Sequence, residues 1–95
     1  MNIKKIADGL EEIMKDTYKK LENKIDNNPE IKRASGDLAT LKGVVNFIDD
    51  EFEKSLSYII DFVRQYDLKE VNEIYSDYYL KIHDMCMNKI KNIMK

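Results

Sequence analysis

Apolar residues recur along the first quarter of the chain at steps of three and four positions. The series comprises Ile3, Ile6, Ala7, Leu10, Ile13, Met14, Leu21 and Ile25. Because an α-helix has about 3.6 residues per turn, this spacing places all of them on one side of a helix. Two acid–lysine pairs four positions apart, Glu11 with Lys15 and Asp16 with Lys20, support the same conformation. The pattern predicts a helix over about residues 2–26.

A stop follows this first helix. The sequence there is Asn27-Asn28-Pro29, and the apolar periodicity ends with it. Asparagine accepts hydrogen bonds from the free N–H groups at a helix start, and proline fits the first helical position because its missing N–H costs nothing there. We therefore expect Asn28 to cap a second helical segment that begins at Pro29.

The second stretch carries a seven-residue repeat. The a positions hold Ile31, Leu38, Val45, Phe52, Ile59 and Tyr66, and the d positions hold Ala34, Leu41, Ile48, Ser55 and Phe62. Apolar residues at a and d over five repeats are typical of a long helix packed lengthwise on others, as in a coiled coil.

One segment of this stretch leaves two alternatives open. The unbroken repeat predicts one continuous helix, whereas Ser35-Gly36-Asp37 is typical of a glycine stop followed by an aspartate start. We expect a kink or a short interruption near residues 35–37. The main helix then covers about residues 38–65, with a short extra helical turn at 29–35 as the alternative to continuity.

The third stretch begins with a start pattern. Asp67 and Glu70 lie three apart like the two halves of a capping box, and Tyr66 and Val71 are spaced like a hydrophobic staple. The apolar face that follows comprises Val71, Ile74, Tyr75, Tyr78, Ile82, Met85, Cys86 and Ile93. A helix over about residues 68–94 is predicted, antiparallel to the previous one because the turn between them is so short.

These elements predict an all-α fold, an antiparallel three-helix bundle with up-down-up topology, formed by residues 1–95 as a single domain. The chain has 95 residues with one proline and three glycines, too few for an all-β fold, which needs turns every 8–12 residues or so. Each main helix would be roughly 36–42 Å long, while a compact sphere of this size has a radius of gyration of only about 12 Å. We therefore expect a rod.

Composition and charge narrow the functional classes. The chain carries 16 basic and 18 acidic residues, a net charge of −2, which argues against a protein built to coat nucleic acid. A single cysteine, Cys86, excludes an intramolecular disulfide framework. Acidic residues interrupt the N-terminal segment where a signal peptide needs an apolar run, and no apolar run is long enough for a membrane span. We expect a cytoplasmic protein that does not bind membranes.

Several apolar residues lie off the predicted core faces and are candidates for a protein interface. They are Phe47, Tyr58, Leu80, His83, Met87, Ile90 and Met94. In the last helix they form a second a/d-type row, rotated by well over about 100° from the first. In an antiparallel bundle we expect the second helix near Phe47 to lie beside the third helix near Leu80 to Met87, so that the surplus residues form one patch. The alternative is a thicker core that absorbs them.

The tyrosines of the last helix allow the same two interpretations. Tyr75, Tyr78 and Tyr79 crowd a single turn. Tyrosine is common at the margin of a core, where its ring is buried and its hydroxyl is wet, and also at interface hot spots. The margin of the core is the interpretation we favour.

No catalytic or metal-binding constellation emerges. His83, Asp84 and Cys86 are close in sequence, but adjacent helical residues point about 100° apart, and Cys86 lies on the predicted core face. One cysteine and one histidine are too few for a zinc site, which takes about four ligands. The acidic run at residues 49–53 lacks the glycine of a calcium loop, which favours a solvated helix face. We expect no enzyme activity, no cofactor, no metal and no small-molecule substrate.

The function predicted from these patterns is protein–protein interaction by a small helical protein of adaptor, chaperone, inhibitor or immunity type, with self-association into a homodimer. A nucleic-acid-associated helical protein is the alternative. In length and helical character the chain resembles the small immunity proteins of bacteriocin systems, and small bacterial or phage proteins in general, although this similarity rests on size class and on no motif.

Overall fold

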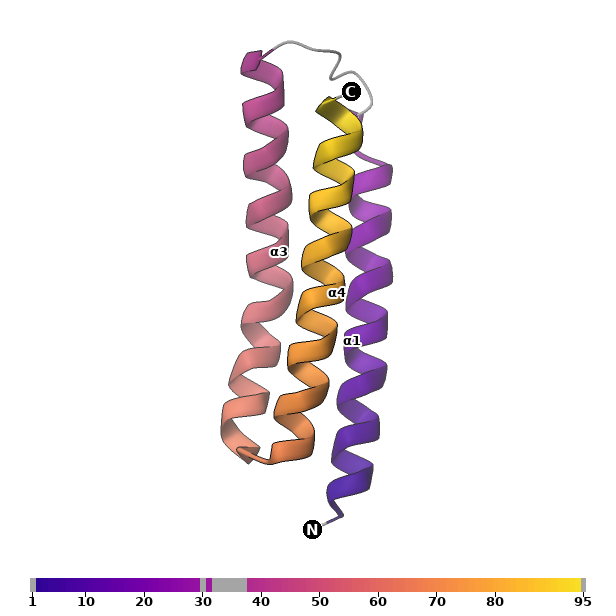
Figure 1. Cartoon of the computed structure of the whole chain (residues 1–95), viewed down its shortest axis with the longest axis vertical. Helices are drawn as coiled ribbons and strands as arrows, with labels where there is room; N and C mark the ends of the chain where they lie inside the picture. The colour runs from indigo at the N-terminus through magenta and orange to yellow at the C-terminus, as the bar shows by residue number, and fades with distance from the viewer. Residues whose placement is uncertain (1, 30, 32–37, 95) are drawn as a thin grey trace.

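The protein is a bundle of three long helices (Figure 1). The computed structural model describes residues 2–29, 31 and 38–94. Helix α1 spans Ile3–Asp26, α3 spans Leu38–Tyr66 and α4 spans Lys69–Met94. The expected all-α three-helix bundle is confirmed, and these helix ends lie within one residue of the predicted ones.

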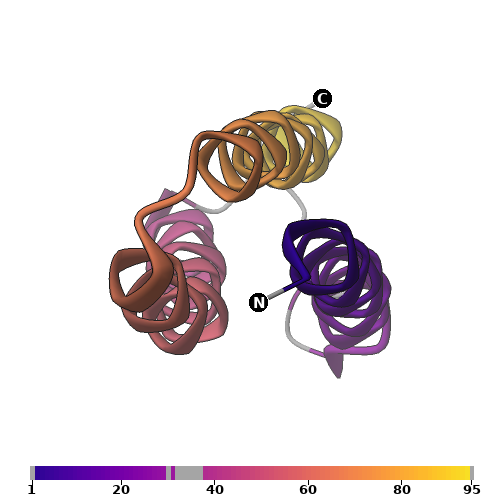
Figure 2. The ribbon, with the colours of Figure 1, turned by 90° about the horizontal axis from the view of Figure 1, so that it is seen from below.

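The helices run up, down and up, so that α1 and α4 are parallel and α3 is antiparallel to both (Figure 1). Seen along the axis, they occupy the corners of a triangle (Figure 2). Helix α4 packs extensively against both neighbours, whereas the contact between α1 and α3 is sparser. The molecule measures 52 × 17 × 17 Å and its radius of gyration is 15.4 Å, above the value of about 12 Å for a compact sphere. The predicted rod shape is therefore confirmed.

The core is apolar throughout. Its most deeply buried side chains are Leu10, Met14, Leu21 and Ile25 from α1, Ile48 from α3, and Val71 and Ile82 from α4. Within the described residues, no polar or charged side chain is buried. Burial of apolar surface therefore drives the packing, at about 25 cal/mol per Å² removed from water.

The buried stripe of α3 departs from the predicted a/d seam. Its buried side chains are Val44, Ile48, Leu56, Ile59 and Val63, while the a/d residues Val45, Phe52 and Phe62 are only half-buried. Ile48 and Ile59 belong to the repeat, whereas Val44, Leu56 and Val63 fall at its e and g positions beside the a/d seam. Burial therefore follows a stripe that is rotated from the seven-residue repeat.

Among the described residues, three polar contacts between side chains tie the helices together. The Lys89 ammonium donates to the Asp26 carboxylate at 2.6 Å, and both residues lie near the C-terminal ends of their helices, α4 and α1. The Tyr78 hydroxyl donates to Glu11 at 3.2 Å, further toward the N-terminal ends of the same pair. An ion pair bridges the sparser α1–α3 contact, with 2.8 Å between Lys24 Nζ and Glu51 Oε2. The Glu51 side chain is only 13% exposed.

The turn between α3 and α4 differs from the predicted capping box. Asp67 adopts a left-handed conformation with φ of 43°, and its N–H bonds to the Val63 carbonyl at 3.0 Å. This is the single hydrogen bond of a left-handed helix C-terminus, so Asp67 ends α3 and does not cap α4. The backbone carbonyl of Leu68 receives the first helical bond of α4, from the Asn72 N–H at 2.9 Å. Glu70 still lies in the first turn of α4, where its charge suits the helix dipole.

The expected start after the first helix is confirmed. The Asn28 side chain accepts a hydrogen bond from the Ile31 N–H at 3.4 Å, and Pro29 is helical. The expected interruption near residues 35–37, and with it the question of continuity through Gly36, lies outside the described residues.

Candidate protein-binding groove

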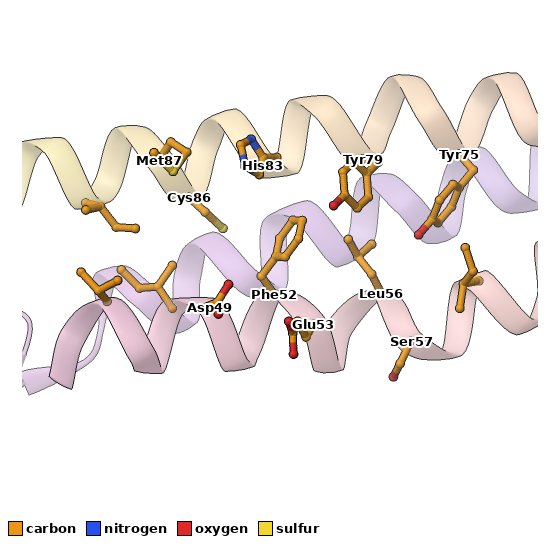
Figure 3. Close-up of a pocket in the computed structure, with 14 residues that line it drawn as sticks. Asp49, Phe52, Glu53, Leu56, Ser57, Tyr75, Tyr79, His83, Cys86 and Met87 are labelled. Atoms are coloured by element: carbon orange, nitrogen blue, oxygen red, sulfur yellow. The ribbon is translucent and has the colours of Figure 1, made fainter. Parts of the chain in front are cut away.

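An elongated groove runs along the bundle between α3 and α4 (Figure 3). Its volume is about 650 Å³. From α3 it is lined by Val45, Ile48, Asp49, Phe52, Glu53, Leu56, Ser57 and Ile60, and from α4 by Tyr75, Tyr79, His83, Cys86, Met87 and Ile90. On each helix the lining runs over 16 residues, 45–60 on α3 and 75–90 on α4, which is a length of about 22 Å at 1.5 Å per residue. The groove therefore matches the length of a four-turn helix.

Aromatic rings form the middle of the groove. Phe52 reaches from α3 toward α4 and meets Tyr79 and His83 edge-on, with ring centroids 5.4 and 6.0 Å apart (Figure 3). Tyr79 and His83 are nearly parallel, at 6.4 Å and 10°, because residues four apart on a helix stack along its side. Tyr75 continues the row, 6.0 Å from Tyr79. The rings hold each other in place and leave part of their surface in the groove.

Large apolar side chains remain exposed along α4 beside these rings. Leu80 is 60% exposed, Met87 is 41% exposed and Tyr79 is 37% exposed. Leu80 does not line the groove itself but is exposed on α4, about one helical turn before His83 and two turns before Met87, both of which line the groove. Together these residues give the α4 side of the groove an apolar surface that the bundle does not cover.

The α3 side of the groove is acidic. Asp49 and Glu53 both line it, and they lie four residues apart on one side of the helix. Among the described residues, neither carboxylate forms an ion pair or a hydrogen bond. Among the described residues, the other ionisable groups in the lining are Tyr75, Tyr79, His83 and the Cys86 thiol, and none is a lysine or an arginine.

The chemistry of Cys86 is that of a buried thiol. Burial, with a smaller contribution from the Asp49 carboxylate, raises the pKa of Cys86 to about 11. A thiol in this state is protonated at neutral pH and is a poor nucleophile. His83 Nδ1 lies 3.8 Å from Asp84 Oδ1, and the His83 ring packs against the rings of Phe52 and Tyr79. Within the described residues, no group of three or more His, Cys, Asp or Glu side chains is arranged to hold a metal ion, and no helix is long and apolar enough to cross a membrane.

The structure brings together part of the predicted interface set. His83, Met87 and Ile90 line the groove, and Leu80 lies beside it. Phe47 does not join them. It lines a recess on another side of α3, together with Lys20, Asn23 and Lys24 of α1 and with Asn27 and Asn28. The expectation that Phe47 forms one patch with these residues is therefore wrong.

Two further candidates lie elsewhere. Tyr58 follows Phe47 by eleven residues, or three helical turns, and therefore shares its side of α3, where it is 81% exposed. Met94 ends α4, and its side chain lies outside the described part of the chain. Ile90 and Phe47 are half-buried against the core, as the alternative of a thicker core expects.

The tyrosines divide between the two interpretations. Tyr75 and Tyr78 pack at the margin of the core, as expected, and Tyr79 is more exposed and lies in the groove. Sequence reasoning missed Phe52, Asp49 and Glu53 as groove residues. The sequence pattern placed Phe52 in the core seam and the two acids on a solvated face. Phe52 and Glu53 follow Asp49 by three and four positions, and this spacing was the available indication that the three residues lie on one side of the helix.

Comparisons with known proteins add no relative, since no protein-family model, no curated protein and no solved structure matches the chain.

Proposed function

We propose that this protein is a non-enzymatic helical module that binds another protein, and that the α3–α4 groove receives one helix of that partner. The observation that carries the proposal is the groove itself, an apolar channel about 22 Å long with Leu80 and Met87 exposed along its α4 side. Helix-in-groove recognition uses such a surface, with apolar side chains of one helix laid between two others. Methionine adapts its shape to varied partners, and aromatic rings supply large contact areas.

Two observations favour a protein partner over the alternatives. The carboxylates of Asp49 and Glu53 would repel a phosphate backbone, which disfavours nucleic acid in this groove. Burial and the raised pKa of Cys86 leave no activated nucleophile beside His83, which disfavours an enzyme. A cytoplasmic location is part of the same proposal, supported by the free thiol of the single cysteine, since reducing compartments keep such thiols unpaired.

The experiment is titration of a fluorescent amphipathic peptide of about sixteen residues, with leucines on one face and glutamines on its edges, against the protein. We expect micromolar binding that Leu80→Glu and Met87→Glu both weaken at least tenfold, because each puts a charge into an apolar contact. Ile13→Glu is the matched control, since Ile13 is 46% exposed on α1, away from the groove. Circular dichroism checks that each variant is folded.

Two results would overturn the proposal. One is failure of the peptide to bind the unaltered protein at concentrations up to roughly hundreds of micromolar, the affinity range of the weakest specific contacts. The other is an equal loss of binding in Ile13→Glu and Leu80→Glu, which would mean that the peptide does not use the groove.

A further inference from the structure

The geometry points to a basic amphipathic helix as the partner element that fills the α3–α4 groove, with apolar residues on one face and lysine or arginine along its edges. This inference rests on the proposed function and adds the chemistry of the partner. It is carried by the charges that border the groove.

The α3 border presents two carboxylates without partners. Asp49 and Glu53 lie four residues apart on one side of α3, so their charges repel each other. By contrast, the neighbouring Glu51 turns to the other side of α3 and is neutralised by Lys24 of α1. Asp49 and Glu53 line the groove and have no such cation beside them among the described residues.

The α4 border carries charges of both signs outside the groove lining. Asp77 and Asp84 lie three residues before and four residues after the exposed Leu80, on its side of the helix, and Lys91 follows Met87 by four residues. Two other lysines of α4 are held elsewhere: Lys89 bonds to Asp26 of α1, and Lys81 lies over the ring of Tyr78, 4.6 Å from its centroid. The carboxylates that line the apolar channel are therefore those of Asp49 and Glu53 on α3.

The middle of the groove suits a cation too. Aromatic faces attract ammonium and guanidinium groups. Phe52 lies between Asp49 and Glu53 on α3, and the rings of Tyr79 and His83 contact it from α4. A lysine or arginine that reaches from the partner helix toward α3 would meet a carboxylate and a ring together.

The same charges disfavour a second copy of this chain as the occupant. Symmetric pairing brings the same surface of two subunits face to face. A pairing that places α3 of one copy against α3 of the other would oppose Asp49 and Glu53 to the same two acids. Such a homodimer would bring like charges together, whereas a basic helix would bring cations to these carboxylates.

The test compares three synthetic peptides that share the leucine face described above and carry lysine, glutamine or glutamate on their edges. We expect the lysine peptide to bind about threefold to tenfold more tightly than the glutamine peptide, and the glutamate peptide to bind most weakly. Added salt should reduce this preference, because the contacts are exposed to solvent. The double variant Asp49→Asn/Glu53→Gln should remove most of it.

The control is Asp50→Asn/Asp61→Asn, which changes the net charge equally but alters two α3 acids that do not line the groove. Equal affinity for the lysine and glutamine peptides would overturn the inference and leave the proposed function standing. Equal loss in the control and in the Asp49/Glu53 variant would also overturn it, because the preference would then reflect net charge. A dimer in sedimentation that Leu80→Glu dissociates would identify the second copy as the occupant and refute the basic helix.

Discussion

Two residues of α4 that are two positions apart should respond very differently to the same truncation. Ile82 is completely buried and Leu80 is 60% exposed. Ile82→Ala removes a side chain from the helix that packs against both others, and buried truncations of this kind cost about 2–5 kcal/mol. The better helix propensity of alanine offsets only about 0.4 kcal/mol of this. Leu80→Ala should change the free energy of unfolding by less than about 0.5 kcal/mol.

The cost for Ile82→Ala is a large fraction of the whole, since a chain of this length has a stability of about 5–14 kcal/mol. We expect its midpoint of thermal unfolding to fall by about 10–30 °C. The assay is urea unfolding followed by circular dichroism, with Ile82→Val, at a cost of about 0.5–1.5 kcal/mol, as the milder variant in case the alanine variant does not fold. Similar losses for Leu80→Ala and Ile82→Ala would refute the assignment of Leu80 to the surface and of Ile82 to the core.

Four further predictions concern the Cys86 thiol (two of them), the α3–α4 turn and the α1–α3 contact. Because the pKa of Cys86 is raised to about 11, its thiol should react with a disulfide reagent at pH 8 roughly a hundredfold more slowly in the folded than in the urea-unfolded protein; comparable rates would contradict its burial. Because the pKa of Cys86 is higher in the folded than in the unfolded protein, burial of the protonated thiol contributes fully to stability below its unfolded pKa of 9.0, and this contribution is lost as the pH rises toward about 11. The loss of stability at alkaline pH should therefore be smaller in Cys86→Ala. Asp67→Gly should raise the free energy of unfolding by about 0.5–1 kcal/mol, because glycine adopts the left-handed conformation freely; a loss in urea unfolding would contradict this. Glu51→Gln should cost at most about 1 kcal/mol, and less in high salt, since it breaks the ion pair with Lys24; a cost that salt does not reduce would show that the contact is not electrostatic.

The helices were predictable because their signals are local. The spacing of Leu10, Met14, Leu21 and Ile25 defines a single stripe on α1, and all four are buried in the structure. Asn28 and Pro29 ended the first helix as their chemistry requires. The prediction that Asp67 caps the last helix was wrong. An aspartate side chain is typical of a helix start, but the Asp67 backbone adopts a left-handed conformation that ends α3.

The position of the groove was not predictable from periodicity. A three-helix bundle can be arranged with either hand, and the hand decides which side of α3 faces α1 and which faces α4. The spacing of apolar residues is the same in both cases. Phe47 was therefore expected beside α4 and lies instead on the α1 side, while Phe52 lies in the groove. His83 and Met87 could be found because their own helix shows two apolar rows.

Nuclear magnetic resonance of the backbone amides during titration with the lysine-edged peptide tests the central claim most directly, because it locates the bound peptide residue by residue. The account predicts shifts concentrated along residues 45–60 of α3 and 75–90 of α4, the segments that line the groove. The outer face of α1 around Ile13 should be unaffected. Shifts centred on α1, or on the side of α3 that carries Tyr58, would contradict the assignment of the α3–α4 groove as the protein-binding surface.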